Sequence, residues 1–150
     1  MSSFVIDTDT TAPSVSSSSP ADSARAGRNS TISITFSEGM DNSTITTNTS
    51  NTSCSGSLQL SSNNFSSCIQ MTSSPTASNS SKTFTISPSS NLSLSTTYKI
   101  RITTGVKDSA GNALGSQWTT SSGFTTRWTQ QLGTSAKEVG YGVTVDSSNN

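Results

Sequence analysis

The chain has 150 residues and no formal net charge at pH 7, it contains no histidine, and about two fifths of it is serine or threonine. This length fits one domain with a piece of a second. A neutral chain lacks the basic surface that nucleic acids require, and no apolar run is long enough to cross a bilayer. Without histidine, the commonest general base and the usual catalytic triads are missing. The composition therefore favours a non-enzymatic domain.

Alternation of apolar and polar residues marks the predicted strands in the first half of the chain. It is clearest at 31–36, where Ile32, Ile34 and Phe36 would face a core and the residues between them would face water. Shorter strands are expected at 14–18 and 44–47. Threonine supports such strands, because its branched Cβ fits a pleated, half-buried surface.

The stretch 48–81 is the least regular part of the chain. Within it, the runs 57–61 and 68–72 are expected to pair as a hairpin, with their leucine, isoleucine and methionine side chains turned inward. The segment 73–81 is of low complexity, and we expect it to be a mobile loop.

The only two cysteines, Cys54 and Cys68, both lie in this stretch. An even pair in a β domain rich in serine and threonine favours a disulfide, and with it an oxidising compartment. The bond would close a loop of roughly 15 residues, worth about 3 kcal/mol in the chain-entropy description. Two free thiols in a reducing compartment are the alternative.

Regular alternation returns in the second half of the chain. Strands are expected at 82–86, 97–103 and 117–126, with Phe84, Ile86, Tyr98, Ile100, Ile102 and Phe124 facing inward. Tyr98 fits either a tyrosine corner, in which the hydroxyl bonds to upstream backbone, or an ordinary core tyrosine. Together the runs predict an all-β sandwich of about seven strands.

Several short segments resemble, in the same order, the bacterial Ig-like domains typified by S-layer proteins. They are 9–13 (DTTAP), 32–41 (ISITFSEGMD), 84–88 (FTISP), 94–98 (LSTTY), 106–114 (VKDSAGNAL) and 123–126 (GFTT). The resemblance implies an Ig-like Greek-key β-sandwich over 9–126, and it departs from the family pattern at 48–81, where the segment with the cysteines is longer.

The resemblance also implies a role and a location. It points to a spacer or adhesion domain of a larger secreted or outer-surface bacterial protein, without enzymatic activity. Its partners would be other domains of the same polypeptide. The resemblance leaves open, in addition, a host or matrix protein or a carbohydrate as a partner.

The two ends of the chain fall outside the Ig-like segment. Residues 1–8 are expected to be a linker or the remnant of a preceding domain, without the basic and apolar regions of a signal peptide. Residues 127–150, with WTQQLG at 128–133 and GYGVTVD at 140–146, resemble the start of a seven-bladed β-propeller repeat that stops before the blade is complete. A partial blade has no neighbour to cover it, so we expect this tail to be poorly ordered.

Acidic residues supply the one candidate for chemistry. In an Ig-type sandwich, the start of the first strand, the loop after the second and the loop before the last lie at the same end. These segments contain Asp7, Asp9, Glu38, Asp41, Asp108 and Asn112. Calcium takes six to eight oxygen ligands from carboxylates, amides and carbonyls. The placement therefore predicts a calcium site, although no contiguous calcium-binding loop motif is present.

Each of these residues also has a purely structural interpretation. Asp9 could cap the turn before Pro13, Asp108 and Asn112 could close their own loop as Asx turns, and Glu38 could pair with Lys107. A carbohydrate-binding module remains a further alternative, to be favoured by an exposed aromatic patch.

Overall fold

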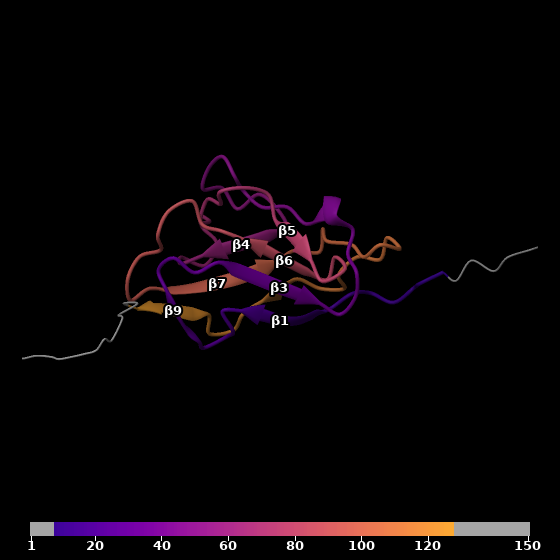
Figure 1. The fold of residues 1–150 in the computed structure, drawn as a ribbon, viewed down its shortest axis with the longest axis horizontal. Coiled ribbons are helices and arrows are strands. Elements are labelled where there is room, and N and C mark those ends of the chain that lie inside the picture. The colour runs from indigo at the N-terminus through magenta and orange to yellow at the C-terminus, as the bar shows by residue number, and fades with distance from the viewer. Residues whose placement is uncertain (1–7, 128–150) are drawn as a thin grey trace, which may run out of the picture.

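Nine β-strands and one short 3-10 helix form the part of the chain that the computed structural model describes, residues 8–127 (Figure 1). One sheet has the order β1-β3-β6-β5, with bounds Val15–Ser19, Ile32–Phe36, Thr83–Ile86 and Thr76–Ser78. The other has the order β2-β9-β7-β4, with bounds Arg25–Gly27, Phe124–Arg127, Thr97–Ile102 and Leu58–Ser61, and β8 (Trp118–Thr119) pairs with β7. Over residues 8–127, no helix is long and apolar enough to span a membrane. The all-β sandwich is confirmed.

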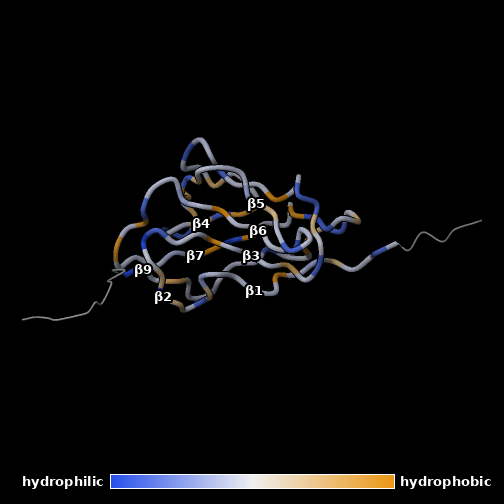
Figure 2. Tube along the Cα trace, in the orientation of Figure 1, coloured by the Kyte–Doolittle hydropathy of each residue, from blue (hydrophilic) through white to orange (hydrophobic). Residues whose placement is uncertain are grey.

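The core lies between the two sheets and follows the predicted alternation. Hydrophobic positions line the facing strands (Figure 2), and every second residue of β3, β6 and β7 is buried. Phe36 packs edge-on against Phe84, and Tyr98 stacks on Phe124, with ring centroids 6.0 and 5.8 Å apart. These aromatic pairs join neighbouring strands within each sheet.

The tyrosine corner is confirmed. The hydroxyl of Tyr98 accepts a hydrogen bond of 2.9 Å from the backbone N–H of Ser93, five residues upstream, while its ring is buried. The bond fixes the loop before β7 against the strand.

The predicted third strand at 44–47 is wrong, because side chains take the place of ladder partners there. Asp41 caps a 3-10 helix, η1 (Asn42–Thr44), by accepting a hydrogen bond from the backbone of Ser43. The hydroxyl of Ser57 then accepts from the backbone N–H of Thr46 and donates to the carbonyl of Thr44. These contacts tie the segment to the start of β4, and it joins neither sheet.

Three further strand predictions need correction. Segment 68–72 does not pair with β4 as a hairpin; β4 pairs antiparallel with β7, and Met71 forms a single bridge with Pro88. The expected mobile loop 73–81 contains β5, which pairs with β6. The strand expected at 117–126 is divided into β8 and β9, and β2, whose three residues are too few for alternation, was not expected at all. With β5 and without strands at 44–47 and 68–72, residues 8–127 contain nine strands in place of about seven.

Cys54 and Cys68 form the predicted disulfide, with Cα atoms 5.0 Å apart. Cys68 also donates its backbone N–H to the carbonyl of Thr52. The loop between the cysteines is therefore held at its base twice, once covalently and once by a hydrogen bond.

The first and last strands run along the long axis of the molecule. The described chain enters at one end of this axis and leaves at the opposite end, after β9 (Figure 1). β2 pairs with β9 in parallel, Arg25 opposite Thr125, and β1 pairs antiparallel with β3. A pull on the two ends therefore acts along the strands that hold them.

Candidate functional site

Three carboxylates meet at the end of the sandwich where the chain enters. Asp9 precedes β1, Glu38 follows β3, and Asp108 lies in the loop between β7 and β8, and one carboxylate oxygen of each lies within 4.8 Å of the others. Two oxygens bound to one calcium ion at 2.3–2.6 Å can be about 5 Å apart at most. The spacing of this acidic cluster therefore fits a shared calcium ion.

Backbone contacts between two loops bring the acidic cluster together. Met40 forms an antiparallel β-bridge with Asp108. The backbone N–H of Ser109 donates to the carbonyl of Gly39, and the backbone N–H of Asp41 donates to the carbonyl of Lys107. These bonds join the loop after β3 to the loop after β7, although the two loops are about 70 residues apart in the sequence.

Hydrogen bonds hold Asp108 and Asp9 in place. One Asp108 oxygen accepts from the backbone N–H groups of Ala110 and Asn112 at 2.9 and 2.8 Å, and the other accepts from the Asn112 side-chain amide at 3.0 Å. The same amide donates to the backbone carbonyl of Asp9 at 2.8 Å, and Asp9 accepts from the backbone N–H of Thr11. The structural roles of Asp9, Asp108 and Asn112 thus coexist with the acidic cluster.

The cluster also raises the proton affinity of one member. Burial, followed by the hydrogen bond and negative charge of Asp9 and then those of Asp108, raises the pKa of Glu38 from 4.5 to about 7. Burial also raises the pKa of Asp108, which is only 1% exposed, but hydrogen bonds from Asn112 and Ala110 outweigh it and lower the pKa overall. Of the three carboxylates, Glu38 is therefore the one whose affinity for a proton is raised.

This raised pKa predicts a pH dependence of stability. Between about pH 4.5 and 7, folded Glu38 binds more protons than unfolded Glu38, so the free energy of unfolding should fall as pH rises through this window. Thermal unfolding in calcium-free buffer at a series of pH values measures the effect.

A pair of variants isolates the contribution of Glu38. Glu38→Gln cannot ionise and should flatten the decline and stabilise the domain at pH 8. Asp22→Asn is the matched control, because the pKa of Asp22 is lowered from 3.8 and its own titration lies below the window. An unchanged decline in Glu38→Gln would contradict the assignment.

The remaining predicted ligands lie apart from the acidic cluster or outside the described residues. The carboxylate of Asp41 accepts from the backbone and hydroxyl of Ser43; these bonds lower its pKa, and the positive charge of Lys107 adds to them. Within residues 8–127, Glu38 forms no ion pair with Lys107. Asp7 and the proposed propeller segment after Arg127 lie outside residues 8–127.

One carboxylate with a structural role was missed by the sequence analysis. Asp22, in the turn before β2, accepts hydrogen bonds from the backbone N–H groups of Ser122 and Gly123 at 2.9 and 2.6 Å and from the hydroxyl of Ser121. These bonds lower its pKa, that from Gly123 most strongly, against a smaller opposing effect of burial. Its partners are about 100 residues away, so no local pattern could reveal them.

The described residues offer no aromatic platform for stacking sugars at Trp118. This side chain is half-buried and packs against the core, while Trp128 lies outside the described residues. The aromatic criterion for a carbohydrate-binding module is thus not met at Trp118.

Comparison with known proteins agrees with the topology. Residues 9–126 match the family described as "Bacterial Ig-like domain". No curated protein matches the chain.

Solved structures show the same fold at low identity. The N-terminal part of the bacterial S-layer protein SbsC is 19% identical with a TM-score of 0.54, and the match covers 78% of this chain and 24% of that one. SbsC domains 1–6 are 20% identical with a TM-score of 0.53, and the match covers 79% of this chain and 14% of that one. CopC from Methylosinus trichosporium OB3b is 11% identical with a TM-score of 0.50, and the match covers 80% of this chain and 98% of that one.

The match spans only a small part of the S-layer structures, so it shows the shared fold and not the activity of the whole proteins. The family match, in contrast, covers well over half of this chain, from the segment before β1 to the last residues of β9. Over residues 9–126, the chain belongs to the bacterial Ig-like domain family.

Proposed function

We propose that this domain is a non-catalytic mechanical spacer in a longer, extracytoplasmic bacterial surface polypeptide, whose partners are the neighbouring domains of that chain. The observation that carries the proposal is the path of the chain, which enters and leaves at opposite ends of the long axis (Figure 1). The S-layer relatives and the disulfide support the location, because disulfides persist in oxidising compartments.

The pairing of the first and the last strand with their neighbours suits a spacer under tension. A pull on the N-terminal end acts on β1, which is paired antiparallel with β3 and continues through a turn into β2. A pull on the C-terminal end acts on β9, and since β2 and β9 are parallel, it loads the hydrogen bonds between them in shear. Asp22 adds three hydrogen bonds between the turn before β2 and the loop before β9, and the backbone N–H of Ser23 donates to the carbonyl of Gly123 at 2.7 Å. These bonds, together with the ladder between the two strands, make up what we call the joint between β2 and β9.

The outer face of the four-stranded sheet is suited to staying solvated. All eight of its outward side chains carry a hydroxyl group: Ser17, Ser19, Ser33, Thr35, Thr76, Ser78, Thr83 and Thr85. Cross-strand hydroxyl pairs form between Ser33 and Thr85 and between Thr35 and Thr83, at 2.9 and 3.0 Å. Such a face has neither charge nor an apolar patch to recruit other proteins, as a spacer requires.

Force measurements on two aspartate variants test the spacer function. Asp22→Ala should lower the force at which the domain unfolds when it is pulled through its two ends, because the joint between β2 and β9 loses three hydrogen bonds. Asp41→Ala is the matched control, since Asp41 is also an exposed aspartate bonded to a nearby serine but lies outside that joint. Equal unfolding forces for the two variants would count against the proposal.

A second candidate function is calcium binding at the end where the chain enters, which would stiffen the junction with a preceding domain. The acidic cluster of Asp9, Glu38 and Asp108 favours it, because three carboxylates within 4.8 Å repel each other unless a proton or a cation is present. Asn112 already links Asp9 to Asp108 and keeps these ligands in place without the ion.

Calcium should raise the melting temperature at pH 8 and give a saturable heat in calorimetry. Glu38→Gln should lose most of both effects, and Asp22→Asn, with the same change in charge outside the acidic cluster, should keep them. The absence of any heat or shift in melting temperature for the unaltered chain would rule out the calcium site and leave the spacer function untouched.

A further inference from the structure

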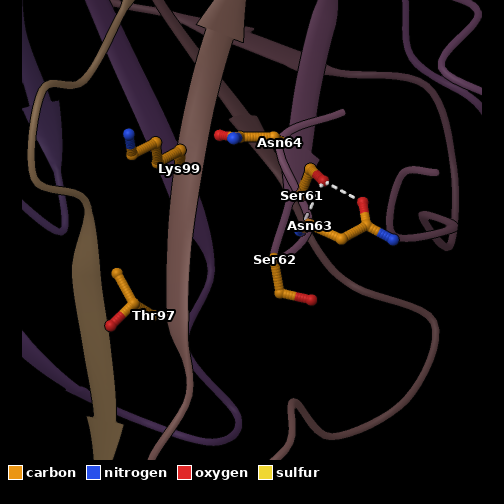
Figure 3. A pocket seen from close by; sticks show the side chains of 6 residues that line it. All are labelled: Ser61, Ser62, Asn63, Asn64, Thr97 and Lys99. Carbon is orange, nitrogen blue, oxygen red and sulfur yellow. Dashed lines mark hydrogen bonds between the residues drawn. The ribbon is translucent and has the colours of Figure 1, made fainter. Parts of the chain in front are cut away.

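An open pocket of about 300 Å³ lies beside β7, and it shares no residue with the acidic cluster. Its lining consists of Ser61, Ser62, Asn63, Asn64, Thr97 and Lys99. In Figure 3, the loop that follows β4 forms one side, and Thr97 and Lys99 project from β7 on the other. The lining contains hydroxyls, amides and one ammonium group, and no carboxylate.

The loop side of the pocket is held rigid by its own hydrogen bonds. The hydroxyl of Ser61 accepts from the backbone N–H groups of Asn63 and Phe65 and donates to the carbonyl of Ser67 at 2.7 Å. The amide of Asn63 donates to the hydroxyl of Ser67. Asn64 and Phe65 both have positive φ, 57° and 63°, a conformation that asparagine adopts comparatively easily and that is uncommon for a bulky residue such as phenylalanine.

Two further contacts fasten this loop to the sheet. The guanidinium of Arg101, on β7, lies 4.0 Å from the centroid of the Phe65 ring and donates to the side chain of Gln59. The Cys54–Cys68 disulfide closes the loop just beyond Ser67. The segment 48–81, which departs from the family pattern, thus supplies a preformed wall.

Some lining groups remain available to a ligand. The side chains of Ser62, Asn64 and Lys99 have no hydrogen-bond partner within residues 8–127, whereas Ser61 and Asn63 are occupied by the loop network and Thr97 by Thr125. An ammonium group, a free amide and a free hydroxyl that line one pocket can bind a carboxylate and neighbouring hydroxyls of one ligand.

We propose that this pocket binds a saccharide unit that carries a carboxylate, that is, a uronic acid. Lys99 would pair with the carboxylate, and Asn64 and Ser62 would bind ring hydroxyls, which both donate and accept. The volume is at the lower end of the range for small-molecule sites, which suits one or two sugar rings. A single cation among amides and hydroxyls suits this ligand better than a phosphate, whose higher charge calls for several donors or cations.

The test is a titration of the whole chain, followed by ¹H–¹⁵N spectra, with three probes. The probes are a glucuronic-acid-containing disaccharide, a neutral glucose disaccharide and inorganic phosphate. The acidic disaccharide should shift the amides of Ser62, Asn64, Thr97 and Lys99 with saturation, and the other two probes should bind at least tenfold more weakly.

Variants identify the cation responsible. Lys99→Gln should weaken binding of the acidic disaccharide at least tenfold, whereas Lys82→Gln, the same change at an exposed lysine before β6, should leave it unaltered. The proposal is overturned if the acidic disaccharide gives no saturable shift, if phosphate or the neutral disaccharide binds equally well, or if the two variants behave alike.

Discussion

Gly123→Ala should destabilise the domain by about 3–5 kcal/mol, since backbone strain and overpacking each cost a few kcal/mol. Gly123 has a φ of +80°, and a Cβ at this position would lie 2.4 Å from the carbonyl oxygen of Tyr98. That oxygen belongs to the central strand β7 and cannot move without disturbing the sheet. The backbone N–H of Gly123 also donates to Asp22, so any shift would weaken the joint between β2 and β9.

Gly111→Ala separates the clash from the unfavourable dihedral angle. Gly111 has a similar φ of +96°, but nothing lies within 4 Å of its added Cβ. Gly111→Ala should therefore lower the free energy of unfolding by only about 1 kcal/mol, the usual cost of a non-glycine residue at a positive φ. Urea unfolding of both variants measures the difference, and equal losses would show that the close approach to Tyr98 does not constrain the fold.

Loss of the disulfide has the second large expected effect. Replacing Cys54 and Cys68 together by serine should lower the free energy of unfolding by about 3 kcal/mol, because the unfolded chain regains the freedom of a loop of this length. Reduction of the unaltered chain should give the same loss in urea unfolding. A loss well under 1 kcal/mol in both experiments would show that the loop is held by its hydrogen bonds alone.

The parts of the fold that could be predicted are those in which burial alone decides the structure. At 31–36 and 97–102, alternate apolar residues have no stable position other than facing the core, and both segments form strands as expected. At 68–72 the prediction was wrong because the backbone N–H groups donate to carbonyls of several different segments, so that no single neighbouring strand forms a ladder. At 44–47 it was wrong because the hydroxyl of Ser57 bonds to the backbone of this segment in place of a ladder partner. In a chain so rich in serine and threonine, this competition is hard to anticipate.

The candidate site was predictable only as far as the topology reaches. Strand direction places Asp9, Glu38 and Asp108 at the same end, and there the structure brings their carboxylates together. It does not place Asp41 among them, because a local bond to Ser43 holds that side chain. The links from Asp22 to Gly123 and from Arg101 to Phe65 join distant segments that carry no shared pattern, so they required the structure.

The direction of pulling tests the proposed spacer function most directly. One preparation is pulled through the two chain ends, and a second through handles at Ser17 and Ser78, on the two edge strands of the four-stranded sheet. Pulling on the edges peels β5 from β6 one bond at a time, whereas pulling on the ends loads the joint between β2 and β9 in shear. We expect a clearly higher unfolding force through the ends; an equal or lower force would contradict a mechanical role for this domain.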